Sequence, residues 1–174
     1  MQQNEIKRKT GGSSIGLIAA LSAISMLFAA FSSAYLVRRG LGGDWEPLSL
    51  PGFFSPLLLI LGSVVLEIGW KGGRKKLGIY VAVMLGMLFL YSQVYAILKL
   101  SKLSKLSGAV PISTAAAFFC ILSGSFCVFL VGGIAALIGS LGRGSHLTSK
   151  NVVYYWHYLS VLWLYLLGLL YWGN

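Results

Sequence analysis

The chain has 174 residues, of which 57% are hydrophobic and 10% are charged, and its mean hydropathy is +0.81. Too few polar side chains remain to cover a soluble globule, so the composition indicates an integral membrane protein with little mass outside the lipid. The net charge of +10 does not indicate a nucleic-acid partner, because the cations lie in short connections beside apolar segments, where they set topology and meet anionic headgroups.

Five apolar stretches are long enough to cross a bilayer as helices, since about 20 residues at 1.5 Å per residue span a hydrocarbon core of about 30 Å. Transmembrane β-strands alternate polar and apolar residues, and this chain has no such alternation. The sequence therefore predicts an all-α polytopic transmembrane bundle of five helices, with a cytoplasmic tail over residues 1–13 and one transmembrane domain over residues 14–174. The predicted spans are 14–37, 53–70, 77–98, 112–140 and 152–172.

The connections carry unequal numbers of Lys and Arg, nine on the side that includes the N-terminal tail and five on the other side. The positive-inside rule places the N-terminus in the cytoplasm and the C-terminus outside. The first span also has features of a signal peptide, namely a basic start and small residues near its end. A retained helix is favoured, because the apolar stretch is longer than a usual signal core and Arg38 and Arg39 follow it directly.

Ligands for a redox centre are scarce. A haem between helices needs axial ligands at membrane depth, and His157 with four scattered Met residues cannot supply a multi-centre site. His146 lies in a polar connection. Cys120 and Cys127 are seven residues apart on one helix, about 10.5 Å, which is too far for a disulfide, so they are interpreted as packing residues. No cofactor is expected in this chain.

Glu67 is the one acidic residue inside a predicted span, and an ionisable residue in a membrane helix is a candidate functional residue. Lys71 follows at the i+4 position near the cytoplasmic end, so the spacing predicts an interfacial ion pair, with contact to a partner subunit as the alternative. Gln93 lies about 16 residues into its helix. Together with His157, these residues are the polar candidates for a transport pathway if they line a common cavity.

Aromatic residues gather at both ends of the last span, as in the belts found at membrane–water interfaces. Trp163 lies in the middle of that span, and His157 is interpreted as an interior hydrogen-bonding residue tied to the cluster around it. Small residues predict faces where helices approach closely: Ala29, Ala30, Ser33 and Ala34 on the first helix, and Gly132, Gly133, Ala135, Ala136 and Gly139 on the fourth.

Short motifs recur in chain order over about 150 residues. They are Met26-Leu27-Phe28 with Ala34-Tyr35 and Arg38; Trp45 with Pro47 and Leu50-Pro51; Ser63 with Leu66-Glu67; Leu85-Gly86 with Phe89, Gln93 and Tyr95; and Tyr155-Trp156-His157-Tyr158 with Trp163. In this order they resemble subunit III of the haem-copper oxidase superfamily, cytochrome c oxidase subunit III. The Trp-His pair with the later Trp is the most specific element. The chain corresponds to the last five of the seven helices in typical members.

The resemblance implies an accessory, redox-inactive subunit of a respiratory complex or supercomplex in a prokaryotic plasma membrane. Its partners would be catalytic subunit I, other oxidase subunits and membrane phospholipids, with haem and copper held in the catalytic subunit. It implies no catalytic or metal-binding residue in this chain. The candidates for structural, interface or lipid contacts are Arg38, Glu67, Gln93, Trp156, His157 and Trp163.

The chain departs from the family pattern at several polar positions. Ile24 stands where the family often has a Glu, Phe126 and Phe129 stand at the positions of two His, and Ser160 replaces an acid. These departures remove most of the groups tied to proton entry, so the resemblance supports a structural role. The alternatives are an accessory subunit associated with nitric-oxide reductase and a small transporter. A stand-alone enzyme lacks a nucleophile with a positioned base and a metal-ligand cluster.

Overall fold

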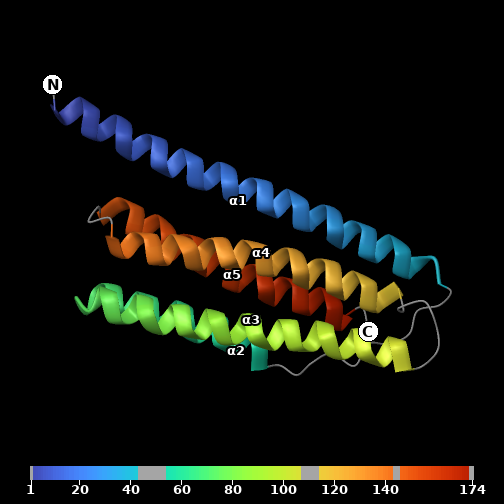
Figure 1. The fold of residues 1–174 in the computed structure, drawn as a ribbon. Helices are drawn as coiled ribbons and strands as arrows, with labels where there is room; N and C mark the ends of the chain where they lie inside the picture. Colours follow the sequence, from blue (N-terminus) through green and yellow to red (C-terminus); the bar gives the residue numbers. More distant parts are fainter. Residues whose placement is uncertain (1, 43–53, 107–113, 143–145, 173–174) are drawn as a thin grey trace.

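The structure is a computed structural model that describes residues 2–42, 54–106, 114–142 and 146–172, and the regular secondary structure of these residues is entirely α-helical. The first residue of α1 and the last of α5 lie at opposite ends of an elongated bundle, and successive helices run in opposite directions (Figure 1). The described helices are α1 (Gln2–Gly40), α2 (Phe54–Lys71), α3 (Lys75–Leu106), α4 (Thr114–Gly142) and α5 (His146–Trp172).

The all-α prediction is confirmed for the described residues, and four of their helices are long and apolar enough to cross a membrane. These spans are Ile15–Gly40, Lys75–Leu100, Thr114–Leu141 and Lys150–Trp172. The predicted fifth crossing falls on α2, whose 18 residues reach about 27 Å, slightly less than a typical hydrocarbon core. At the start of the chain, α1 begins at Gln2 and continues through the segment expected to be a tail.

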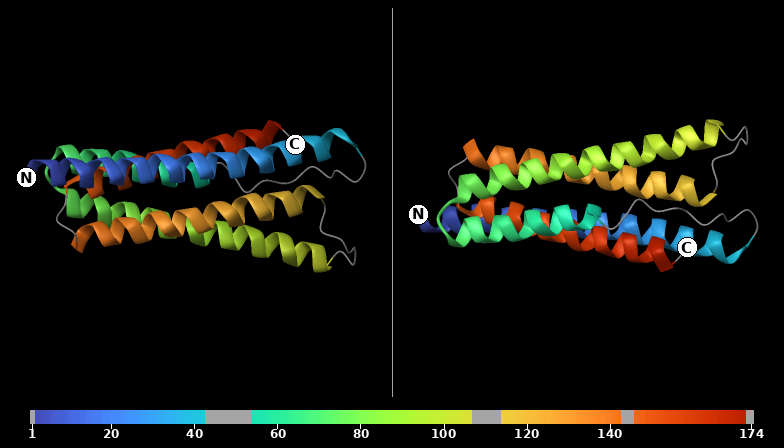
Figure 2. Two further views of the ribbon diagram at one scale, coloured as in Figure 1. Left: turned by 90° about the horizontal axis from the view of Figure 1, so that it is seen from above. Right: turned by 90° about the horizontal axis from the view of Figure 1, so that it is seen from below.

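Helices α2 to α5 form a ring in which each helix packs against the next and α2 also packs against α5. Helix α1 lies outside this ring, along the side formed by α5 and α4 (Figure 2). The interior of the ring is apolar and aromatic, whereas many large apolar side chains point outward, as expected where lipid is the solvent. The fully buried side chains of the ring include Leu59, Phe89, Phe119, Leu122, Phe126, Leu130, Leu137, Trp156, Leu159, Trp163 and Leu166.

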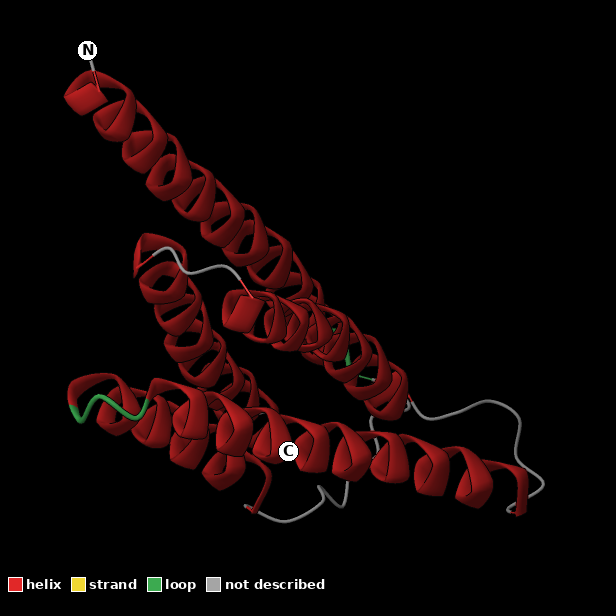
Figure 3. Ribbon diagram, turned by 60° about the vertical axis from the view of Figure 1, so that its left-hand side comes forward, coloured by secondary structure: helices red, strands yellow, loops and turns green. Residues whose placement is uncertain are grey.

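Glycines allow α2 and α3 to approach closely beside the turn that joins them, which is shown in green in Figure 3. A Cβ atom on Gly69 would lie 3.0 Å from the Cα of Gly78. The turn itself is closed by a 2.8 Å hydrogen bond from Gly72 N to Ile68 O, and Gly73 has a φ of +72°, which favours glycine. The hairpin therefore depends on small residues at its crossing.

The indole of Trp156 on α5 is fully buried in a slot lined by glycines from two other helices. A Cβ atom on Gly62 of α2 would lie 3.1 Å from its Nε1, and a Cβ atom on Gly86 of α3 would lie 2.8 Å from its Cη2. Ile134 of α4 also closes on Gly86, at 3.1 Å from the same Cβ position. A single rigid side chain thus determines how closely these helices approach one another.

Aromatic contacts attach α1 to the ring. Phe28 packs edge-on against Phe129 with 5.9 Å between ring centroids, and Tyr35 packs against Phe118 at 5.7 Å. The small residues predicted to form a packing face on α1, Ala29, Ala30, Ser33 and Ala34, are exposed instead. They lie on the side of α1 that faces away from the described helices of this chain.

We expect Gly86→Ala to lower the free energy of unfolding by about 1–3 kcal/mol, because the added methyl group meets the rigid, enclosed Trp156 ring. Gly132→Ala is the matched control, since a Cβ atom on Gly132 meets nothing within 4 Å and alanine is the better helix former. Unfolding in mixed micelles, followed by circular dichroism, measures both. Equal stability of the two variants would contradict the tight slot.

Candidate functional site

A row of polar residues on α2 faces a matching row on α5. Ser55, Ser63 and Glu67 are spaced at multiples of four residues and therefore lie on one face of α2. His157 and Ser160 are three residues apart on α5 and likewise share a face. We call these facing rows the α2/α5 seam.

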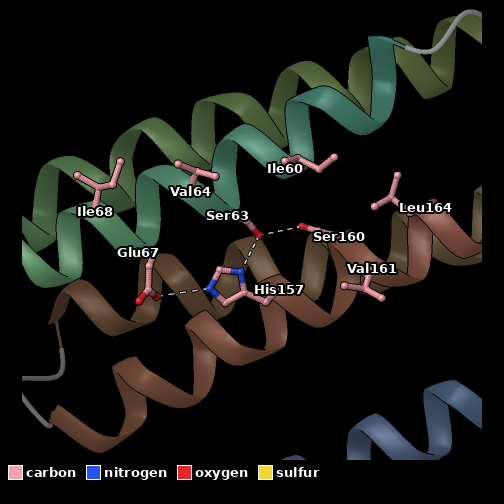
Figure 4. A pocket seen from close by; sticks show the side chains of 9 residues that line it. All are labelled: Ile60, Ser63, Val64, Glu67, Ile68, His157, Ser160, Val161 and Leu164. Carbon is pink, nitrogen blue, oxygen red and sulfur yellow. Dashed lines mark hydrogen bonds and ion pairs between the residues drawn. The ribbon is translucent and has the colours of Figure 1, made fainter.

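The end of the seam beside the α2/α3 turn holds an ionic cluster. The Nζ of Lys71 lies 2.9 Å from Oε1 of Glu67, which confirms the predicted i, i+4 ion pair. The other carboxylate oxygen, Oε2, lies 3.7 Å from Nε2 of His157 (Figure 4). The carboxylate of Glu67 therefore has two nitrogen-bearing partners, one on its own helix and one on α5.

A chain of hydrogen bonds continues from His157 into the bundle. Its Nδ1 lies 2.9 Å from Ser63 Oγ, which in turn lies 3.0 Å from Ser160 Oγ. The Ser160 hydroxyl also contacts two main-chain oxygens, that of Leu59 at 3.2 Å and that of Trp156 at 3.1 Å. Carbonyl oxygens only accept, so the Ser160 hydroxyl donates to them. In the Ser63–Ser160 and His157–Ser63 contacts either partner can be the donor.

A groove of about 370 Å³ runs beside the seam between α2 and α5. Its polar groups are the Glu67 carboxylate and the side chains of the hydrogen-bond chain, and the remaining lining side chains are aliphatic (Figure 4). The groove is lined by Ile60, Ser63, Val64, Glu67, Ile68, His157, Ser160, Val161 and Leu164. A mainly aliphatic groove with its carboxylate at one end suits an aliphatic chain better than an ion.

Gln93 lies apart from this groove, on the interface between α3 and α4. Ser123 donates a 2.8 Å hydrogen bond to its Oε1, and both side chains are buried. Glu67, His157 and Gln93 therefore do not line a common cavity, which removes the condition on which a transport pathway depended. The amide instead joins two helices, as polar side chains commonly do within membranes.

Trp163 is buried in an aromatic cluster with Phe89 of α3, at 5.1 Å between centroids, and Phe126 of α4, at 4.7 Å. Its Nε1 also donates to Ser55 Oγ at 3.4 Å. The interpretation that His157 is tied to this cluster is wrong. Six positions turn a helix by about 240°, so His157 faces Ser63 and Glu67 of α2 while the Trp163 ring reaches α3 and α4.

The two remaining predicted residues have different surroundings. Trp156 is buried, and its Nε1 is a buried side-chain nitrogen without a hydrogen-bond partner among the described residues. Arg38 is exposed in the last turn of α1. Among the described residues, no group of three or more His, Cys, Asp or Glu could hold a metal ion. The outer-connection motif with Trp45, Pro47 and Leu50-Pro51 lies outside the described residues.

Sequence reasoning identified Glu67, Gln93 and His157 but missed the serines that form hydrogen bonds with His157 and Gln93. Ser63 was noted as part of a motif and Ser160 as a departure from the family pattern, without a structural role. The signal was the four-residue spacing between Ser63 and Glu67, which places both on one helix face. Ser123, by contrast, has no such marker, because its partner Gln93 lies 30 residues away.

The fold and the site define a small multi-helix membrane protein whose interior polar groups join its helices to one another. No model of a known protein family matches the chain. Three curated proteins are similar to it along most of its length. Two are named "Cytochrome c oxidase subunit 3". The protein of Thermostichus vulcanus is 28% identical over 90% of this chain and 85% of its own length. The protein of Synechocystis sp. is 27% identical over 90% of this chain and 73% of its own length. "Probable cytochrome c oxidase subunit 3" of Mycobacterium leprae is 24% identical, over 91% and 86%.

We expect Ser63→Ala to destabilise the bundle by about 1 kcal/mol, because it breaks the hydrogen-bond chain between α2 and α5. Ser140→Ala is the control: Ser140 is similarly buried, but its hydroxyl donates only to Leu137 O of its own helix. Mixed-micelle unfolding of both variants tests this expectation. A loss for Ser63→Ala no larger than that for Ser140→Ala would show that the seam does not join the helices.

Trp163→Ala is expected to cost about 3–5 kcal/mol, because it leaves a large cavity among the rings of Phe89 and Phe126. Trp172→Ala removes the same side chain from an exposed position at the end of α5, with an expected effect within about 0.5 kcal/mol. Thermal unfolding in dodecyl maltoside compares the two. Similar midpoints would be inconsistent with a central packing role for Trp163.

Proposed function

We propose that this chain is an accessory, redox-inactive subunit of a haem-copper terminal oxidase in an aerobic respiratory chain. It packs against the catalytic subunit and stabilises it, while haem and copper reside in that partner. The similarity along about nine-tenths of the chain to proteins named cytochrome c oxidase subunit 3 carries this proposal. The proposed setting is the plasma membrane of a prokaryote, with the N-terminus in the cytoplasm and the C-terminus outside.

The position of the most specific motif supports this function. Trp156 and His157 are adjacent on α5, and they serve two different interfaces of the same bundle. Trp156 fills the slot beside Gly62 and Gly86, while His157 joins the seam through Ser63. The motif residues thus hold the bundle together, which fits a subunit that contributes rigidity to a complex rather than a reacting group.

The groove beside the seam supports a role in binding lipid. Its volume of about 370 Å³ and its aliphatic lining suit an acyl chain, and the ionic cluster of Glu67, Lys71 and His157 lies at one end where a headgroup would sit. A lipid seated there would fill the surface between α2 and α5. It would also keep water away from the hydrogen-bond chain, which strengthens each bond in it.

A transporter is disfavoured by the placement of Gln93, which is buried against Ser123 and does not face the groove of Glu67 and His157. Ion pathways through membranes need several polar groups in series. Within the described residues, the seam instead ends on the main-chain oxygens of Leu59 and Trp156. These bonds close the polar chain inside the bundle.

The decisive experiment is purification of the tagged chain in mild detergent, with a visible haem spectrum and mass spectrometry of its partners. A haem-bearing multi-helix partner and oxygen consumption are expected. Nitric-oxide turnover by the eluate would instead assign the chain to a reductase. A colourless chain without partners, recovered from several gentle detergents, would overturn the proposal and make transport the next activity to test.

A further inference from the structure

Helix α3 carries a regular row of large side chains on its outer surface. Tyr80, Met84, Met87, Tyr91, Val94 and Leu98 are all exposed and are spaced alternately by four and three residues; we call them the α3 outer stripe. Tyr95 is exposed beside it. Alternating three- and four-residue spacing is the pattern by which one helix packs along another at a shallow crossing angle. Met adapts its shape to irregular partner surfaces.

The hydroxyl groups on this surface distinguish it from an ordinary lipid-facing row. Tyr91 lies 16 residues after Lys75 and nine before Leu100, the ends of its span, so it is about 24 Å and 14 Å along the helix from them. That depth is too great for its hydroxyl to reach the headgroups. Neither the Tyr91 nor the Tyr95 hydroxyl forms a hydrogen bond with any residue that the structure describes. Lipid tails offer no acceptor, so an unpaired hydroxyl there is costly.

Other hydroxyls of this protein show how the cost is avoided. Ser32 and Ser92 donate to carbonyl oxygens of their own helices, at Phe28 and Phe89. A tyrosine hydroxyl stands too far from its own backbone to do so. The inward-facing tyrosines therefore reach a neighbouring helix: Tyr155 on α5 donates to Phe129 O of α4 at 2.9 Å.

The approach of Tyr155 to α4 is possible because Gly133 lies beneath its ring, with a Cβ position 2.9 Å from the ring's Cε1. In the same way, Tyr158 of α5 reaches Leu21 O of α1 at 3.3 Å and Ser25 Oγ at 2.7 Å. These two half-buried tyrosines thus each meet a small residue and a main-chain oxygen on the adjacent helix. Tyr91 requires the same kind of partner.

A second copy of the chain does not supply the small residue and main-chain oxygen that the Tyr91 hydroxyl requires. In a symmetric pair the stripe would meet itself, and two rows of Tyr and Met would hold the backbones too far apart for a hydroxyl to reach a carbonyl oxygen. Pairing the stripe with the exposed small residues of α1 from another copy, such as Ala29 and Ala30, would be a heterologous contact, which builds a ring or an open filament instead of a two-fold pair. A helix of a different protein supplies small residues without such an assembly.

We propose that the α3 outer stripe is the surface against which a transmembrane helix of the catalytic subunit packs. The small residues of that helix bring a main-chain oxygen to the hydroxyl of Tyr91. This inference rests on the proposed function, and it specifies which face of the chain contacts the catalytic subunit. The exposed row of Tyr and Met then becomes part of an interface between subunits, and α1 lies on another side of the ring.

Photo-crosslinking in native membranes tests the location. The amino acid p-benzoylphenylalanine replaces Met84, Tyr91 or, as a control, Val128, an exposed residue on α4. Adducts with the catalytic subunit are expected from positions 84 and 91 and not from position 128. Adducts with a second copy of the chain, or with lipid alone, at positions 84 and 91 would overturn the proposal.

The hydroxyl itself is tested by Tyr91→Phe, which keeps the ring. We expect the ratio of catalytic subunit to tagged chain after detergent washing to fall about three- to fifteen-fold, the range for one inter-helix hydrogen bond in a membrane. Tyr154→Phe, on an exposed position near the start of α5, makes the same change close to the headgroups and outside the stripe, and it should leave the ratio unchanged. Equal ratios for both variants would contradict the proposal.

Failure of the interface can be separated from failure of the proposed function. The unsubstituted chain is purified in parallel, and its haem-bearing partner is the readout of the function. If that partner is present and the stripe neither crosslinks to it nor responds to Tyr91→Phe, the interface assignment is wrong and the function stands. Unchanged thermal unfolding of the Tyr91→Phe chain shows that loss of the partner does not come from misfolding.

Discussion

The rest of the structure depends on the fit of the Trp156 indole between α2 and α3. The ring is fully buried, and glycine stands at two positions, Gly62 and Gly86, where a Cβ atom would come within about 3 Å of it. Helices in lipid gain little from hydrophobic burial against one another, so close packing and inter-helix hydrogen bonds must hold them together. A large rigid ring over two glycines provides such packing. Its indole nitrogen, which has no partner among the described residues, is a cost that this packing must offset.

Polar groups complement that packing at defined places on the ring. The seam from Glu67 through His157 to Ser160 joins α2 with α5, and the Gln93–Ser123 hydrogen bond joins α3 with α4. Each group that could have formed a pathway is used to join two helices. These contacts join α2 with α5 and α3 with α4, two of the four neighbouring pairs of the ring.

Much of the fold and part of the site could be predicted from the sequence. Apolar stretches located the helices to within a few residues, except where α1 continues back to Gln2, α3 on to Leu106 and α5 back to His146, which was predicted to lie in a polar connection. The Glu67–Lys71 pair was predictable because both residues lie on one helix at a fixed spacing. The partners of His157 and Gln93 were not, since Ser63 and Ser123 lie 94 and 30 residues away and hydropathy carries no information on which helices become neighbours.

The sequence by itself determined that the chain is helical, that it belongs in a membrane, and which few polar residues lie within its spans, because the requirements of lipid act on each segment separately. Only the tertiary structure decided which face of each helix packs against another helix and which face is exposed. It placed the small residues of α1 outside and the glycines beside Trp156 inside, and it left Tyr91 exposed while Tyr155 found a carbonyl oxygen. The physical reason is that a helix face acquires its role from the neighbour it meets.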